Sequence, residues 1–267
     1  MAVLHELFLN SVVGILEQKS EKVYRRIATG FIYGHLIDTD RCEVYLVTNS
    51  HVVSSFDPDE KIFVICNEGP GGEANHFYLE SSSEEHENLW VRHPDTTVDI
   101  AVYRLDPSFI EENPNVECLY SDSRAAGIDK IIELGISEGD AIFALGFPLG
   151  LFFGNPNGVM VRHGVIARIR EALDRTLNYY LLDLLSFQGS SGSPIISKPD
   201  AHAIEGTETQ HVSQLIGINR GHIRNEEDVI DPHSGKVGVV DTNSGLAVVH
   251  PCDYITETIQ EYKRLND

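Results

Sequence analysis

The chain has few basic residues for its length. It holds 20 Lys and Arg against 41 Asp and Glu in 267 residues, which gives a formal net charge of −21. Proteins that bind nucleic acid or an anionic membrane surface need a basic surface to contact phosphate groups. The composition therefore predicts no nucleic-acid partner and no membrane partner. We interpret the acidic excess mainly as a device for solubility.

Cysteine is scarce as well. Cys42, Cys66, Cys118 and Cys252 are widely separated, and none forms a Cys-x-x-Cys pair. Spacing alone cannot reveal disulfide pairing, so nothing in the sequence supports a disulfide framework. Free, buried thiols in a reducing compartment are the more natural prediction.

The chain also lacks long hydrophobic runs and the marks of a targeting signal. Residues 1–19 show no basic n-region, no long apolar stretch and no small-residue cleavage site, and they carry Glu6 early. These absences predict no signal peptide and no transmembrane span. The expected location is cytoplasmic.

Metal and cofactor motifs are missing too. The twelve histidines form no His-Glu-x-x-His motif or other cluster with ligand spacing. The sequence has no phosphate-binding loop and no Gly-x-Gly-x-x-Gly after a strand. The prediction is no bound metal and no cofactor.

Many short runs with β-like composition are present, separated by turn or charged segments. They lie at Ser11–Glu17, Ala28–Ile37, Cys42–Thr48, Lys61–Cys66, Ile100–Leu105, Asp140–Leu145, Gly158–Ile169, Tyr179–Leu185, Pro194–Ile196, Ser213–Asn219 and Gly245–Val249. No strand–helix alternation accompanies them, so the pattern predicts an all-β sandwich or barrel.

One helix and four loops complete the pattern. Apolar residues at helical spacing predict a terminal helix at Asp253–Tyr262. Polar segments predict loops at Glu68–Asn88, Asp106–Glu117, Lys198–His211 and Gly221–Asn243. Such charged loops are usually solvated tips, although their position after the motifs described next leaves room for gating of a substrate.

Three motifs supply a histidine, an aspartate and a serine, in that order. They are Thr48-Asn49-Ser50-His51-Val52, Val98-Asp99-Ile100-Ala101-Val102 and Gly189-Ser190-Ser191-Gly192-Ser193-Pro194. This order along the chain is that of the chymotrypsin-type hydrolases, whereas the subtilisin and α/β-hydrolase folds use other orders.

Ser191 lies in a glycine-rich turn, which is what a catalytic serine needs. A neighbouring base must take its proton, and backbone N–H groups must converge on the developing oxyanion. The N–H groups of Gly189 and Ser191 are the expected donors of this oxyanion hole. Taken alone, the segment is equally typical of a Ser/Gly-rich hairpin turn.

His51 and Asp99 interrupt apolar segments. As a general base His51 would take the proton of Ser191, and Asp99 would hold the imidazole in its productive tautomer. A carboxylate within a buried strand is costly unless it has such a partner. Taken alone, His51 is also typical of a packed, hydrogen-bonded histidine, and Asp99 of an aspartate at a solvent-facing strand edge.

Together these three motifs resemble the signature blocks of chymotrypsin-fold, trypsin-like serine peptidases. Further blocks at residues 139–150, 161–167, 215–219 and 245–251 are similar to those of bacterial HtrA-type peptidases, and the resemblance spans Ala28–Tyr262. It implies an all-β fold of two antiparallel six-stranded β-barrels with a C-terminal α-helix. Residues 1–125 would carry His51 and Asp99, and residues 126–267 would carry Ser191.

The resemblance implies a serine endopeptidase that acts on protein or peptide substrates without a cofactor. No segment that could form the PDZ domain usual in HtrA-type proteins follows the expected helix, so the chain looks more like the stand-alone intracellular peptidases of bacteria. Gating by a regulatory protein partner or by homo-oligomerisation would fit a protease in the cytoplasm. Two alternatives are a latent or inactive scaffold of the same fold and an esterase with the same triad.

Analogy with the family also locates the substrate-binding residues. Leu185, six residues before the serine, would lie near the base of the S1 pocket and favour small or medium aliphatic side chains. Asn219, Arg220 and His222 would form a wall that pairs with extended substrate. Arg220 or His222 would shift the preference toward acidic side chains if either pointed inward.

Overall fold

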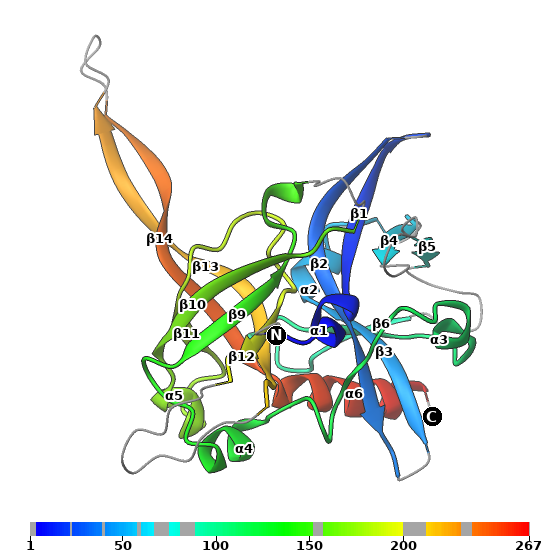
Figure 1. Cartoon of the computed structure of the whole chain (residues 1–267). Coiled ribbons are helices and arrows are strands. Elements are labelled where there is room, and N and C mark those ends of the chain that lie inside the picture. The colour runs from blue at the N-terminus through cyan, green and yellow to red at the C-terminus, as the bar shows by residue number, and fades with distance from the viewer. Residues whose placement is uncertain are drawn as a thin grey trace.

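The computed structural model describes residues 4–21, 23–38, 41–57, 60–66, 75–80, 89–151, 157–199, 212–230 and 237–266. Two β bodies lie side by side, and a C-terminal helix starts at the second body and runs across one end of the first (Figure 1). The chain forms the first body with its N-terminal half and the second with its C-terminal half.

The first body is a curled sheet of eight strands. These are β1 (Val12–Ser20), β2 (Val23–Leu36), β3 (Cys42–Thr48), β4 (Ile62–Cys66), β5 (Asn75–Leu79), β6 (Trp90–Arg92), β7 (Ala101–Arg104) and β8 (Leu119–Tyr120). Their order is β5-β4-β1-β2-β3-β7-β6, with the short β8 beside β2. Register shifts in β1, one of them between Ile15 and Leu16, add the local bend that helps to curl the sheet.

The second body is a closed barrel of six strands. These are β9 (Ala141–Gly146), β10 (Met160–Arg168), β11 (Tyr180–Asp183), β12 (Pro194–Ser197), β13 (Leu215–Ile230) and β14 (Val237–Pro251), in the order β10-β11-β14-β13-β12-β9. β9 pairs with both β10 and β12, which closes the ring. The chymotrypsin-like all-β fold is confirmed, with the difference that the described strands of the first body form an eight-stranded curled sheet instead of a closed six-stranded barrel.

Buried apolar side chains form three clusters. One fills the curled sheet around Ile32 and Leu46, and another fills the closed barrel around Leu182 and Ile195. The third lies between the bodies and includes Phe147. This shared core fixes the two bodies against each other, and residues from both can therefore form one site.

The predicted terminal helix is confirmed and continues to Asn266, as α6 (Asp253–Asn266). Ile255 and Ile259 are fully buried in the shared core, and the ring of Tyr262 packs edge-on against Tyr45 of β3. An ion pair of 2.8 Å between Lys263 and Glu43 adds a second contact with the first body. The remaining helices are short: α1 (Glu6–Asn10), α2 (Ser50–Val53), α3 (Ser108–Glu112), α4 (Ile128–Glu133), η1 (Pro148–Gly150) and α5 (Arg170–Leu173).

The prediction of a loop at Gly221–Asn243 was wrong. β13 and β14 continue through this segment as a paired ribbon that projects from the barrel (Figure 1). Val237, Val239 and Val240 are all exposed there. A two-stranded ribbon with both faces in solvent buries no apolar face, so its sequence shows no core-facing alternation to mark it as strand.

Two other expected loops contain regular structure. β5 lies within Glu68–Asn88, and α3 lies within Asp106–Glu117. The expected loop Lys198–His211 falls outside the described residues from position 200 onward. All four cysteines are free, with Cys42 exposed and the other three buried. The prediction of free thiols is thus confirmed, and that of burial holds for three of them.

Candidate active site

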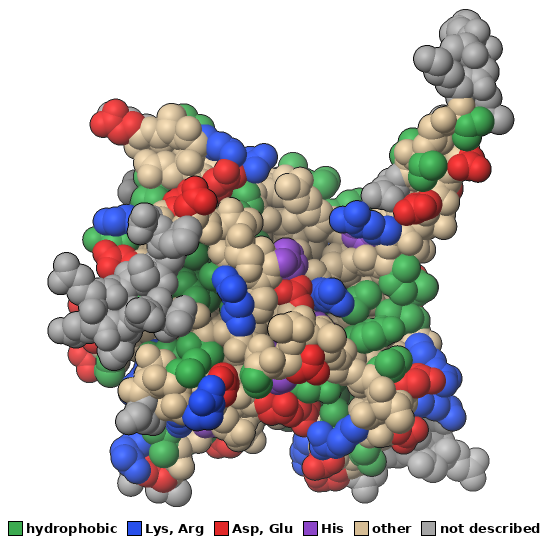
Figure 2. Space-filling view, turned by 180° about the vertical axis from the view of Figure 1, so that it is seen from behind, with side chains coloured by type: hydrophobic (Ala, Val, Ile, Leu, Met, Phe, Trp, Pro, Cys, Tyr) green, Lys and Arg blue, Asp and Glu red, His purple; other side chains and the backbone are tan. Residues whose placement is uncertain are grey.

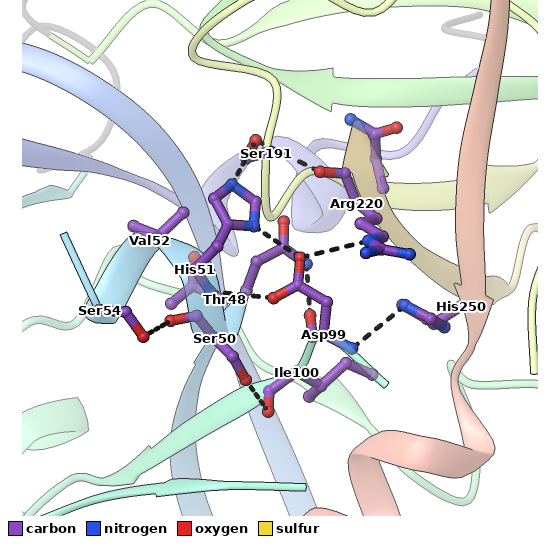
Figure 3. A network of polar contacts seen from close by, with 12 residues as sticks. Thr48, Ser50, His51, Val52, Ser54, Asp99, Ile100, Ser191, Arg220 and His250 are labelled. Carbon is purple, nitrogen blue, oxygen red and sulfur yellow. Dashed lines mark hydrogen bonds and ion pairs between the residues drawn. The ribbon is translucent and has the colours of Figure 1, made fainter. Parts of the chain in front are cut away.

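His51, Asp99 and Ser191 meet at the junction of the two bodies. The imidazole of His51 lies between the other two side chains, with Nδ1 2.5 Å from Asp99 Oδ2 and Nε2 3.1 Å from Ser191 Oγ. Figure 3 shows the three in one line, with Asp99 below the ring and Ser191 above it. Both contacts are within hydrogen-bonding distance, so a proton can pass from the hydroxyl to the ring.

The backbone around His51 and Asp99 is tied together at several points. The N–H of His51 donates to Asp99 Oδ1 over 2.9 Å, and the Asn49 side chain donates to the Asp99 carbonyl over 2.7 Å. The Ser50 hydroxyl donates to the Ile100 carbonyl over 2.7 Å. α2 begins at Ser50, so these contacts hold the first turn of that helix against the Asp99 segment and fix the ring beside its carboxylate.

The Asp99 carboxyl is mostly buried but stays ionised at neutral pH. Burial raises its pKa, but hydrogen bonds from the His51 side chain and N–H, with the charges of His51 and Arg220, lower it by more. The net pKa lies below the ordinary value of 3.8. A permanent carboxylate at this position favours the tautomer of His51 that carries its proton on Nδ1, which leaves Nε2 to accept the proton of Ser191.

A second histidine supports Asp99 from behind. His250 of β14 is fully buried, and its Nε2 accepts the Asp99 backbone N–H over 3.2 Å. Its Nδ1 lies 2.7 Å from the Asn178 carbonyl, to which it donates. Burial is the main cause that lowers the pKa of His250 below its ordinary value, so the ring stays neutral. Figure 3 shows that it approaches from the second body.

The turn that carries Ser191 is held by a threonine of the first body. The Thr29 N–H donates to the Ser191 carbonyl over 2.9 Å, and its hydroxyl donates to the Gly189 carbonyl over 2.7 Å. Gly192 has φ +83, and a Cβ there would come within 2.0 Å of the Thr29 carbonyl oxygen. Only glycine allows this close approach between the two bodies.

The predicted oxyanion donors have suitable geometry. Gly189 has φ +91, and the Gln188 carbonyl accepts a hydrogen bond of 2.6 Å from the Leu149 N–H. In a planar trans peptide the N–H points opposite to the carbonyl, so the Gly189 N–H points away from Leu149. Among the described residues the N–H groups of Gly189 and Ser191 have no hydrogen-bond partner. Both residues line the same cleft as His51.

Two open clefts flank His51. One has a volume of about 350 Å³ and contains Gly189 and Ser191, and the other has a volume of about 660 Å³ and contains Asp99 and Arg220. An extended chain could therefore pass the imidazole and continue on both sides of it.

The predicted substrate-binding residues separate into two groups. Leu185, half-exposed, and Asn219, fully buried, line a small cavity of about 10 Å³ next to Ser190. The Asn219 amide donates to the Ser186 hydroxyl and to the Ser190 carbonyl, so this side chain supports the serine turn. Arg220 and His222 instead line the large cleft beside Asp99.

Two site residues escaped the sequence analysis. Thr29 and His250 lie in apolar stretches that are typical of ordinary strands, at positions distant in sequence from the three motifs. Only the pairing of the two bodies brings them to the triad. In the sequence, His250 is marked only as a histidine that follows an apolar run and precedes a proline, and this pattern is not specific.

No group of three or more His, Cys, Asp or Glu side chains within the described part of the chain could hold a metal ion. The same residues include no helix long and apolar enough to cross a membrane.

Comparison with known proteins adds an independent line of evidence. A family model, the trypsin-like peptidase domain, matches residues 28–204. No curated protein matches the chain. The matched span contains His51, Asp99 and Ser191, as well as Thr29 and the whole serine turn. With a matching fold and two thirds of its length covered, the chain belongs to the trypsin-like peptidase domain family and is a serine peptidase of the chymotrypsin fold.

Proposed function

We propose that the protein is a serine endopeptidase in which Ser191 is the nucleophile, His51 the general base and Asp99 the group that orients His51. The observation that carries the proposal is the position of the imidazole, 3.1 Å from Ser191 Oγ and 2.5 Å from Asp99 Oδ2. A serine hydroxyl is a poor nucleophile without such a base.

In the first half of the reaction, Ser191 Oγ bonds to the carbonyl carbon of the scissile peptide while its proton moves to His51 Nε2. The carbonyl oxygen becomes an oxyanion, which the N–H groups of Gly189 and Ser191 stabilise. One such donor is worth about 2.7–4 kcal/mol in a comparable site. The carbon–nitrogen bond then breaks, His51 gives its proton to the leaving amine, and an acyl-enzyme remains.

In the second half, water attacks the acyl carbon and gives a proton to His51. The bond to Ser191 Oγ breaks, and that oxygen takes the proton back. Asp99 remains a carboxylate throughout and stabilises the protonated imidazole, in keeping with its lowered pKa.

Extended substrate would pair with β13. The last residue of β13 that pairs with β12 is Ile218, opposite Pro194, and the backbone of Asn219 bonds to Gly192 and Ser193 of the serine turn. The edge of β13 beyond Asn219 is available for a substrate strand. Addition of a strand there would place a substrate carbonyl near Ser191, whose hydroxyl lies 3.4 Å from the Arg220 carbonyl oxygen. The small cavity at Leu185 favours a small aliphatic side chain next to the scissile bond.

Other features stay predictions. They are the HtrA-type bacterial relationship, the cytoplasmic location, gating by a protein partner or by self-association, and the division of the chain at residue 125.

A pooled peptide library, read by mass spectrometry, tests the proposal. Wild type should generate internal cleavages, and Ser191→Ala should reduce their rate by about 10⁴-fold or more. The matched control is Ser190→Ala, which removes the neighbouring hydroxyl but not the contact with His51. Equal cleavage by wild type and Ser191→Ala would refute the assignment. Turnover of p-nitrophenyl esters without any peptide cleavage would show an esterase instead.

A further inference from the structure

The larger of the two clefts beside His51 has an unusual charge for this molecule. It is lined from the first body by Ser50, His51, Arg92, His93, Thr96, Val98 and Asp99, and from the second by Arg220, Gly221, His222, Ile223 and Val248. Two arginines therefore face a single carboxylate in a protein whose net charge is −21. In Figure 2, a histidine near the centre of the face has Lys or Arg side chains on both sides.

The single carboxylate of the cleft, that of Asp99, already accepts hydrogen bonds from His51. Asp99 accepts hydrogen bonds from the backbone and the ring of His51, and only 11% of its side chain is exposed. It therefore cannot neutralise two guanidinium groups.

Arg220 retains most of its donors. Its Nε lies 3.7 Å from Asp99 Oδ2, and half of the side chain is exposed. Figure 3 shows Asp99 between His51 on one side and Arg220 on the other. A guanidinium carries five N–H donors, and this ion pair involves only one of its nitrogens. The terminal nitrogens remain available to a ligand in the cleft.

Arg92, at the end of β6, faces the same cleft from the other body. It is exposed, and within the described residues it makes no ion pair and no side-chain hydrogen bond. Its neighbour His93 is different, because it is buried and its Nε2 donates to Glu257 over 3.1 Å. Of the two arginines that line the cleft, Arg92 is therefore the one without a carboxylate partner among the residues that the structure describes.

The rest of the lining suits the stem of a side chain. Val98, Ile223 and Val248 supply apolar surface, and His222 adds a further N–H donor. A cleft of about 660 Å³ is large enough for more than one side chain of an extended peptide.

We propose that this cleft is a subsite for an acidic side chain of the peptide substrate, bound by Arg92 and Arg220. This inference rests on the proposed function and names its substrate class. Arginine matches the planar carboxylate with two parallel hydrogen bonds, and a partly enclosed cleft strengthens such charge-assisted bonds. The cleft adjoins β13 at Gly221, so the acidic residue precedes the scissile bond in a peptide paired with that strand.

Peptide pools test the subsite. Each pool fixes Glu or Gln at one of the three positions that lie two to four residues before the scissile bond, with mixtures elsewhere. Wild type should show a kcat/KM at least ten times higher for Glu than for Gln at one position. Arg92→Gln and Arg220→Gln should each lower that ratio toward one, and the ratio should fall as salt is added. Because Arg220 also contacts Asp99, its substitution would change the absolute rate as well. The readout is therefore the ratio of kcat/KM for Glu to kcat/KM for Gln.

The matched control is Arg170→Gln. Arg170 is an exposed arginine of the second body that pairs with Glu138 and does not line the cleft, so its substitution should leave the ratio unchanged. A ratio of one or less at all three positions in wild type would overturn the subsite. So would a tenfold preference that survives both Arg92→Gln and Arg220→Gln.

Labelling of the same preparations by a neutral fluorophosphonate separates this inference from the proposed function. If wild type neither labels nor cleaves, the catalytic proposal fails and binding is measured instead, by anisotropy of fluorescein-labelled Glu and Gln pools. Tighter binding of a Glu pool that Arg92→Gln abolishes would still support the subsite. Equal binding of both pools would overturn it.

Discussion

Thr29, a residue of the first body, holds the turn of the second body that carries Ser191, the proposed nucleophile. The Thr29 hydroxyl donates to the Gly189 carbonyl and accepts the Phe147 N–H over 3.2 Å, so one side chain contacts both the turn that carries Ser191 and the segment that follows β9. Since Gly189 supplies a proposed oxyanion donor, the catalytic geometry depends on a residue that does not touch substrate.

Thr29→Val should therefore reduce kcat with little change in KM. Valine keeps the volume of threonine but leaves two buried backbone groups without a partner, at a cost of about 1–3 kcal/mol each. We expect kcat to fall by at least about tenfold in steady-state kinetics. The matched control is Thr258→Val, which removes the buried hydroxyl bond to Tyr254 in α6. Equal kcat losses in the two variants would show a purely structural role for Thr29.

His250 makes the free energy of unfolding depend on pH. The buried ring must stay neutral to accept the Asp99 N–H, and its pKa is lowered from 6.5 in the folded state. Below about pH 6.5 the unfolded chain binds a proton at this residue that the folded chain resists. Its contribution to stability is therefore complete above that pH and is lost as pH falls through the lower, folded-state pKa.

His250→Leu should remove this pH dependence. We expect the variant to be less stable than wild type at pH 7.5 by about 1–3 kcal/mol, because the Asp99 N–H and the Asn178 carbonyl lose their partner. The difference in free energy of unfolding between wild type and the variant should be smaller at pH 5.5, as measured by urea unfolding at both pH values. A gap that is constant or widens on acidification would contradict the assignment of a neutral His250.

At the scale of elements, the projecting ribbon is the part of the fold least connected to the rest. From Arg224 opposite Asn243 outward, β13 and β14 pair with each other, and the exposed valines of β14 lie along this part. Asn243 itself belongs to the body, because its amide donates to the Ser186 carbonyl over 2.6 Å. The cleft residues end at Ile223, before the ribbon projects.

Replacement of residues 225–242 by Asn-Gly should leave catalysis intact. The two-residue turn closes the hairpin between Arg224 and Asn243 and keeps the contact with Ser186. We expect kcat/KM on a short peptide to remain within about twofold of wild type, because no core side chain is removed. A loss above tenfold in a variant with an unchanged circular-dichroism spectrum would show that the ribbon acts on the active site.

The limits of sequence-based prediction follow from how each element buries its residues. The strands Cys42–Thr48 and Pro194–Ile196 were predicted to within one residue, and the terminal helix was predicted with its correct start but an end four residues short, because each has an apolar pattern that packs on a core. The ribbon, β6 and β8 were missed, since two of them are very short and the ribbon buries no face. For the site, local motifs indicated His51, Asp99 and Ser191, whereas Thr29, His250 and Arg92 require knowledge of which strands face one another.

At the scale of the whole molecule, the overall acidic charge and the basic cleft would act together in selecting substrates. A net charge of −21 disfavours the approach of acidic peptides over most of the surface. Arg92 and Arg220 then provide a local attraction next to the triad, which would select peptides with an acidic residue at one position and reject uniformly acidic ones.

The triad also depends on both bodies at once. His51 and Asp99 come from the curled sheet and Ser191 from the closed barrel, with the shared core and α6 holding the bodies in place. The reactivity of Ser191 therefore measures whether the two bodies are correctly positioned, and it does so without depending on any preference for a peptide sequence.

The most direct test of the catalytic claim is labelling with a neutral fluorophosphonate, with the modified residue located by mass spectrometry. We expect one adduct, on Ser191, that Ser191→Ala and His51→Ala abolish and Ser190→Ala retains. Absence of labelling in folded wild type, or an adduct on another serine, would contradict it.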